Sequence, residues 1–103
     1  MTNKDLLIAE LLLNVEMDDL KDAGMLAEYA EQAEDIGDSA ISQALIARSK
    51  NRLALMNECQ NSIKNLMTRD GHEMTAIESV YEELLKKYTE NEAERIRLKL
   101  ENI

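Results

Sequence analysis

Hydrophobic residues recur at helical spacing along most of the chain, and the pattern is clearest in its middle. Between residues 39 and 68 a seam repeats at alternating steps of four and three: Leu45, Ser49, Arg52, Met56, Cys59, Ile63 and Leu66. Such a seam is typical of helices that pack nearly antiparallel in a bundle. Similar stripes flank it: Leu12, Asp19, Ala23, Leu26, Ala30 and Ala33 before, and Ile77, Tyr81, Leu84 and Tyr88 after. The pattern therefore predicts three long helices.

Two breaks separate these helices. Gly37 suits the left-handed backbone conformation that follows a helix, and Asp38 or Ser39 can then cap the next helix. At the second break, Asp70 is followed three residues later by Glu73, which is the spacing of a capping box. Both breaks thus combine the end of one helix with the start of another.

We predict an all-α, antiparallel bundle of three helices, over about 4–36, 39–68 and 72–102. Thr89, followed by Glu92, repeats the capping pattern more weakly, so we expect the third helix to kink or restart near Thr89. The end of the chain carries one more apolar helical face: Ala93, Ile96, Leu100 and Ile103.

The composition agrees with this fold. The 103 residues include no proline and three glycines, and good helix formers such as Leu, Ala, Glu and Lys dominate. The length fits a single domain over residues 1–103. No apolar run approaches the roughly 20 residues that cross a membrane, and the first residues lack the features of a secretory signal. One cysteine cannot build a disulfide framework, which fits a reducing cytoplasm.

The N-terminal part of the first helix is apolar on more than one side. Leu6, Leu13 and Met17 lie away from the stripe that carries Leu12. A helix that is apolar nearly all round requires cover on several sides, which three helices of one chain do not supply. We therefore expect a homodimer, with Leu6, Leu13 and Met17 as its self-association face.

Charge is distributed unevenly along the chain, whose formal net charge is -9. Residues 1–38 carry 11 acidic and 2 basic side chains, residues 39–71 carry 2 and 5, and residues 72–103 carry 8 and 5. An acidic first helix and a basic second helix attract each other weakly when they lie antiparallel. Lys and Arg do not cluster as phosphate binding requires, which argues against a nucleic-acid partner.

Two charged residues interrupt the apolar stripes of the first two helices. Asp19 lies 18 residues before Gly37, and Arg52 lies 15 residues after it. At about 1.5 Å per residue, their levels in an antiparallel hairpin differ by about one helical turn, which the arginine side chain can span. We predict an interhelical ion pair between Asp19 and Arg52.

Residues 19–56 resemble the first helical hairpin of ferritin-like, rubrerythrin-type proteins. The similarity rests on the run Tyr-Ala-Glu-Gln-Ala-Glu-Asp-Ile-Gly over residues 29–37, in which small residues precede the closing glycine, followed by Ala40, Leu45 and residues 47–54. The resemblance implies a ferritin-like helical bundle.

In that family, a Glu on the first helix and a Glu-x-x-His on the second bind iron, and two further helices repeat the set. Carried over from Gly37, these positions hold Asp19 and Arg52-Leu-Ala-Leu55 in this chain. A guanidinium repels metal cations and leucine has no lone pair to donate. The resemblance therefore implies a hairpin whose iron site is lost.

Candidates for chemistry are few. His72, the only histidine, is expected in the exposed second break, and Cys59 lies on the apolar seam, where a thiol behaves as a small hydrophobe. One His and one Cys do not make a zinc site. The acidic group Glu16, Asp18, Asp19 and Asp22 lacks a calcium-binding loop and is expected to form an acidic helix face. We expect no catalytic residue, no cofactor and no bound metal.

Three functions remain open. The broad apolar surface of the first helix favours a small, acidic, cytoplasmic and non-enzymatic helical-bundle protein that self-associates or binds another protein. The acidic load of residues 5–38 favours, as the alternative, a decoy or inhibitor of a basic protein that handles nucleic acid. A metal-dependent ferritin-like enzyme ranks last because its ligands are missing. Salt distinguishes the first two, since screening weakens a charge-driven contact.

Overall fold

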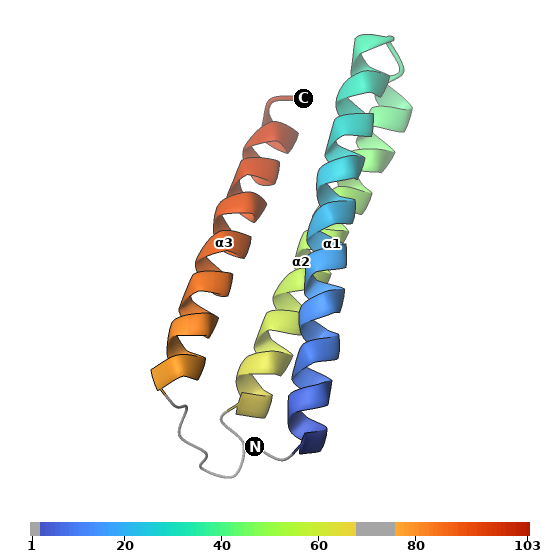
Figure 1. Cartoon of the computed structure of the whole chain (residues 1–103). Helices are drawn as coiled ribbons and strands as arrows, with labels where there is room; N and C mark the ends of the chain where they lie inside the picture. The colour runs from blue at the N-terminus through green and yellow to red at the C-terminus, as the bar shows by residue number, and fades with distance from the viewer. Residues whose placement is uncertain (1–2, 68–75) are drawn as a thin grey trace.

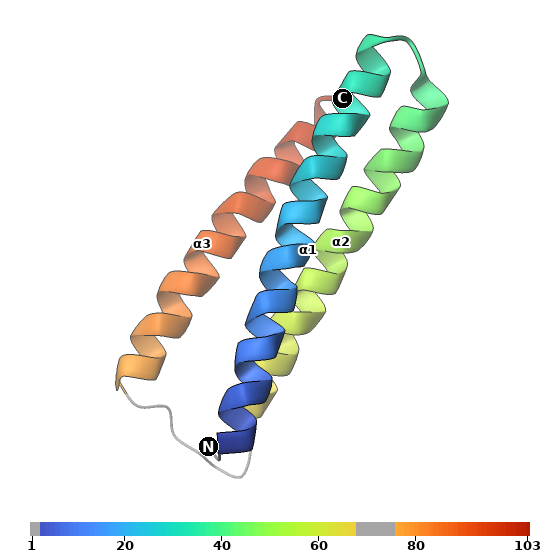
Figure 2. The same cartoon turned by 45° about the vertical axis from the view of Figure 1, so that its right-hand side comes forward.

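The computed structural model describes the backbone of residues 3–67 and 76–103 and, within it, the side chains of Lys4, residues 7–66 and residues 86–103. The protein is an all-α bundle of three helices, α1 (Asn3–Asp35), α2 (Ser39–Met67) and α3 (Ala76–Glu101). Figure 1 and Figure 2 show α1 and α2 as an antiparallel hairpin, with α3 running in the same direction as α1. The predicted fold class is confirmed.

The first break is built as the sequence predicts. Gly37 has a φ of 86°, its N–H donates to Glu34 O at 3.0 Å, and the N–H of Asp38 donates to Ala33 O at 2.9 Å. These two bonds are the Schellman ending of a helix. Asp38 then caps α2, because its Oδ1 accepts a hydrogen bond from the N–H of Ile41 at 3.1 Å. Of the two predicted capping residues, Asp38 has the role.

Small residues bring α1 and α2 close together near this turn. Ala23 and Ala30 of α1 are fully buried. Ser49 Oγ donates to Ala23 O at 2.7 Å, and Ser42 Oγ donates to Ala30 O at 2.9 Å. The same contact thus recurs after two helical turns on both helices. Each buried hydroxyl is satisfied by a backbone carbonyl of the other helix.

The C-terminal half of α3 packs on the hairpin. Ala93, Ile96 and Leu100 are buried in the same core as Leu20. Ile96 lies over Gly24, where an added Cβ would be 3.6 Å from the Ile96 Cδ1 atom. The end of the chain therefore belongs to the bundle, although the tip of the hairpin extends past the end of α3 (Figure 1).

The third helix does not restart near Thr89, because α3 continues unbroken through this residue, while the expected kink there stays a prediction. Thr89 is fully buried. Its hydroxyl donates to Lys86 O at 3.0 Å, within the same helix, instead of capping a new helix start. The predicted capping box of Asp70 and Glu73 lies outside the described residues.

The predicted stripes identify only part of the core. Leu20, Ile46 and Leu53 are buried but lie beside the stripes, whereas Tyr88, which lies on the third stripe, is 52% exposed. A seam with steps of four and three describes a helix with one neighbour. Because α1 contacts both other helices, its buried face is wider than one seam.

Candidate functional site

Polar side chains from all three helices meet inside the bundle, at the levels of α1 farther from the hairpin turn. Gln60 of α2 lies between Glu16 of α1 and Thr89 of α3. Its Nε2 atom donates to Glu16 Oε1 at 2.7 Å and to Thr89 Oγ1 at 2.9 Å. One amide group thereby connects three helices. We call Glu16, Gln60, Thr89 and the neighbouring pair Asp19 and Arg52 the polar layer.

Glu16 is the more deeply buried of the two acids in this layer, with 2% of its surface exposed. Burial raises the pKa of its carboxyl group above the usual 4.5, and the hydrogen bond from Gln60 and the nearby Thr89 hydroxyl act in the opposite direction. A buried acid with a raised pKa is one feature of catalytic sites. Here its hydrogen-bonding partner is the Gln60 amide, which also donates to Thr89 and so joins the helices, and this is the arrangement of a structural contact.

The predicted ion pair between Asp19 and Arg52 is present. Arg52 Nη1 lies 3.3 Å from Asp19 Oδ1 and donates a hydrogen bond to it. The two partners differ in environment, since the Asp19 side chain is 8% exposed and the Arg52 side chain 44% exposed. The arginine thus extends from the surface of α2 to neutralise a nearly buried carboxylate of α1.

Cys59 is half-buried on α2, close to the acids of the polar layer. Burial raises the pKa of its thiol above 9.0, and the negative charges of Asp19, Glu16 and Glu58 raise it further. The thiol therefore stays protonated at neutral pH and is a poor nucleophile. The other candidate for chemistry, His72, lies outside the described residues.

Within the part of the chain that the structure describes, no group of three or more His, Cys, Asp or Glu side chains is placed to hold a metal ion. Where the ferritin-like resemblance would place a metal ligand of α2, Arg52 binds Asp19 instead. None of the described helices has an apolar stretch that could cross a membrane.

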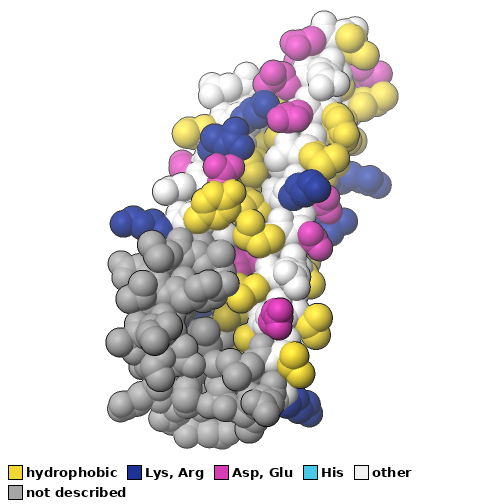
Figure 3. Space-filling view, in the orientation of Figure 1, with side chains coloured by type: hydrophobic (Ala, Val, Ile, Leu, Met, Phe, Trp, Pro, Cys, Tyr) yellow, Lys and Arg dark blue, Asp and Glu magenta, His cyan; other side chains and the backbone are white. Residues whose placement is uncertain are grey.

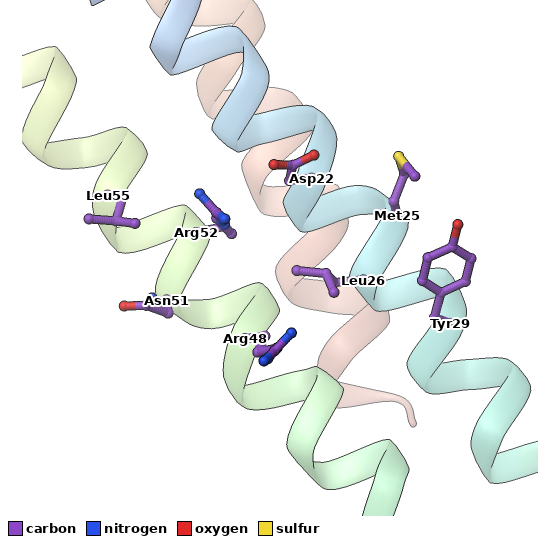
Figure 4. Close-up of a pocket in the computed structure, with 8 residues that line it drawn as sticks. All are labelled: Asp22, Met25, Leu26, Tyr29, Arg48, Asn51, Arg52 and Leu55. Atoms are coloured by element: carbon purple, nitrogen blue, oxygen red, sulfur yellow. The ribbon is translucent and has the colours of Figure 1, made fainter.

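A shallow groove of about 480 Å³ lies between α1 and α2 (Figure 4). Arg48 of α2 and Leu26 of α1 reach into the space between the helices, while Met25 and Tyr29 stand on the outer side of α1. Arg52, already bound to Asp19, lines the same groove. Since Asp22 also lines it, the groove offers a mixed surface of apolar, cationic and acidic side chains.

Among the described residues, a row of exposed apolar side chains lies on the outward side of the N-terminal half of α1. Three large aliphatic side chains are exposed there at steps of four residues, namely Leu7 by 62%, Leu11 by 64% and Val15 by 47%. Lys4 and Asp18, also exposed, lie at the two ends of this row on the same helix face. Hydrophobic side chains are visible along this edge of α1 in Figure 3. We call Lys4, Leu7, Leu11, Val15 and Asp18 the outer stripe.

The outer stripe differs from the face that the sequence analysis selects for self-association. Met17 packs partly against the core, Leu13 is half-buried, and the side chain of Leu6 lies outside the described residues. The sequence did contain a signal for the outer stripe, because its apolar members are bounded by a charged residue on each side along one helical face.

Comparison with known proteins adds no relative. No protein-family model matches this chain, and comparison with curated proteins and with solved structures gives no match either. The resemblance to ferritin-like hairpins stays a prediction.

Proposed function

We propose that this protein is a non-enzymatic helical-bundle module that self-associates or binds another protein through the outer stripe of α1. The observation that carries the proposal is the exposure of Leu7, Leu11 and Val15 as one row on a single helix. Isolated exposed leucines are common on protein surfaces, whereas a contiguous apolar row bounded by charges is typical of an interaction site. Burying this row would remove its aliphatic surface from water.

The polar layer supports a structural role beside this one. Its side chains form hydrogen bonds across the helices, as Gln60 does when its amide donates to Glu16 and Thr89. Such contacts fix how three helices are rotated around a shared core. On this proposal, the layer orients α1 so that the outer stripe points away from the bundle.

We also propose that the protein is located in the cytoplasm. This proposal rests on the single cysteine, whose thiol has a raised pKa and is half-buried. A reducing compartment keeps such a thiol free.

Light scattering on the purified protein tests the association. At high micromolar concentration we expect a mass above that of one chain, and Leu11→Glu should return it to the monomer mass. Leu98→Glu is the matched control, because Leu98 is a similarly exposed leucine, 50% exposed, on α3. Two results together would refute the proposal. The unchanged protein would have the mass of a monomer, and a pull-down would find no partner whose binding Leu11→Glu abolishes.

Salt separates this function from the acidic decoy. An apolar contact should survive about 0.5 M salt, at which screening acts over a few ångströms. A complex with a basic partner that dissociates under these conditions and is indifferent to Leu11→Glu would favour the decoy.

A further inference from the structure

The outer stripe has a pattern that is the same from either end. Its five residues are separated by steps of three, four, four and three, so that Leu11 is central and Leu7 and Val15 are equally far from it. The outermost positions carry opposite charges, Lys4 at one end and Asp18 at the other. A row with these properties is complementary to a reversed copy of itself.

This symmetry identifies the occupant of the stripe. Resting on the proposed function, we propose that two copies of this chain pair through their outer stripes in antiparallel orientation, with the two-fold axis at Leu11. Leu11 then contacts the partner's Leu11, and Leu7 packs against the partner's Val15. Each Lys4 faces the partner's Asp18, which gives two ion pairs at the ends of a short apolar centre. A two-fold contact of this kind uses the same patch on both chains.

The charges exclude the other simple orientation. In a parallel pair each residue faces its own copy, so Lys4 would face Lys4 and Asp18 would face Asp18, and like charges repel. Shifting the antiparallel pair by one helical turn toward the acidic side brings Leu7 opposite Asp18 or Asp19 of the partner. Only the pairing centred on Leu11 covers all three aliphatic side chains and matches both charges.

The size of the contact sets its strength. Three aliphatic side chains per chain form a small interface, at the low end of specific complexes. We therefore expect a weak dimer that forms at micromolar concentrations or above. Its affinity should respond to both the apolar centre and the charged ends.

Site-specific cross-linking tests the register in a Cys59→Ala background, which removes the native thiol. Leu11→Cys should cross-link with itself through a short bis-maleimide. Leu7→Cys and Val15→Cys should each cross-link poorly alone but efficiently when the two variants are mixed. Leu98→Cys is the control for random collision, since its side chain is exposed on α3.

Charge reversal provides a second readout. Lys4→Glu and Asp18→Lys should each weaken the dimer by about tenfold, because every two-fold dimer loses two ion pairs and gains two repulsions. The double variant should recover most of the loss. Circular dichroism of each variant verifies that the helices are intact.

The possible outcomes are distinct. Two results would each overturn the antiparallel register while leaving self-association in place. In the first, Leu7→Cys alone cross-links with itself at least as strongly as the Leu7→Cys and Val15→Cys mixture does. In the second, the double charge variant shows no recovery of the dimer. A stripe that binds a different protein and never a second copy overturns the dimer while leaving protein binding in place. A monomer without any partner overturns the proposed function as well.

Discussion

Near the turn, α1 and α2 meet through alanines and serines, whereas at the other end of the hairpin they bury charged side chains and leave leucines exposed. In the turn half, over residues 23–49, serine hydroxyls reach backbone carbonyls at 2.7 and 2.9 Å. In the open half, over residues 4–19 and 52–66, Glu16 and Asp19 are buried. The same two helices thus use two different kinds of contact.

The two halves therefore differ in how well other helices cover their side chains. Small side chains in the turn half let α1 and α2 approach closely, and α3 covers them there with Ala93, Ile96 and Leu100. In the open half, a buried carboxylate needs a partner from α2, and the apolar residues of the outer stripe remain exposed. The open half is therefore the part of the molecule that a second copy can complete.

The turn half should be the more sensitive to added volume. Ala23→Leu places three extra carbon atoms at a fully buried position that also accepts the Ser49 hydrogen bond. We expect a loss of about 3 kcal/mol in the free energy of unfolding, measured by urea denaturation, because overpacking separates the helices. Glu28→Leu, at an exposed position of the same helix, is the control. A loss below about 1 kcal/mol would mean that the helices can separate there without penalty.

In the open half, we expect removal of the two partners of the ion pair to reduce stability by different amounts. Arg52→Ala leaves the nearly buried Asp19 carboxylate without its partner and should cost about 2–3 kcal/mol. Asp19→Ala should cost less, because the half-exposed arginine can turn to water. The combination Asp19→Leu with Arg52→Met should recover much of the loss. Mild, additive effects of the single changes would contradict the coupling.

A serine hydroxyl is expected to contribute less than the ion pair. Ser49→Ala removes the bond to Ala23 O but leaves an acceptor that belongs to a helix, so the cost should be about 1 kcal/mol. Ser62→Ala, at an exposed position of α2, should be close to neutral. Equal denaturation midpoints for the two variants would show that the interhelical bond adds no stability.

Glu16 should make the stability of the open half depend on pH. Its pKa is raised in the folded protein, so the folded state holds the proton more tightly than the unfolded state does. The contribution is fully present below the ordinary value of 4.5 and is lost as the pH rises through the folded pKa. Glu16→Gln should remove this part of the pH dependence and stabilise the protein at pH 7. Glu10→Gln, an exposed acid on α1, should leave the profile unchanged.

The sequence was sufficient for features that depend on neighbours along the chain or on position along a helix. Gly37 and Asp38 act through their own backbone and side chain, so their roles follow from residue type. The pairing of Asp19 with Arg52 follows from counting along two helices from a known turn. Neither inference requires knowledge of how the helices are rotated.

Rotation is what the sequence left open. Gln60 can join Glu16 to Thr89 only because α3 turns Thr89 toward the other two helices, and no spacing within α2 predicts that. Likewise, the first half of α1 is apolar on several sides, and the packing of α2 and α3 decides which of these sides stays exposed to solvent. The sequence analysis selected Leu13 and Met17, but the structure buries these in part and exposes Leu11.

The smallest effect is expected for a change in the outer stripe, measured as the free energy of unfolding of the single chain. Leu11→Ala removes an exposed side chain, so at low protein concentration the free energy of unfolding should shift by less than about 0.5 kcal/mol. Leu20→Ala on the same helix removes a buried leucine and should cost about 2–5 kcal/mol. At high concentration the unchanged protein should gain stability by mass action, because dimerisation draws on the folded state, and Leu11→Ala should lose this gain. Denaturation at two protein concentrations measures both effects. A large loss of unfolding free energy in Leu11→Ala at low concentration would show that Leu11 stabilises the monomer. If the stability of both proteins is independent of concentration, the open half does not bind a second copy.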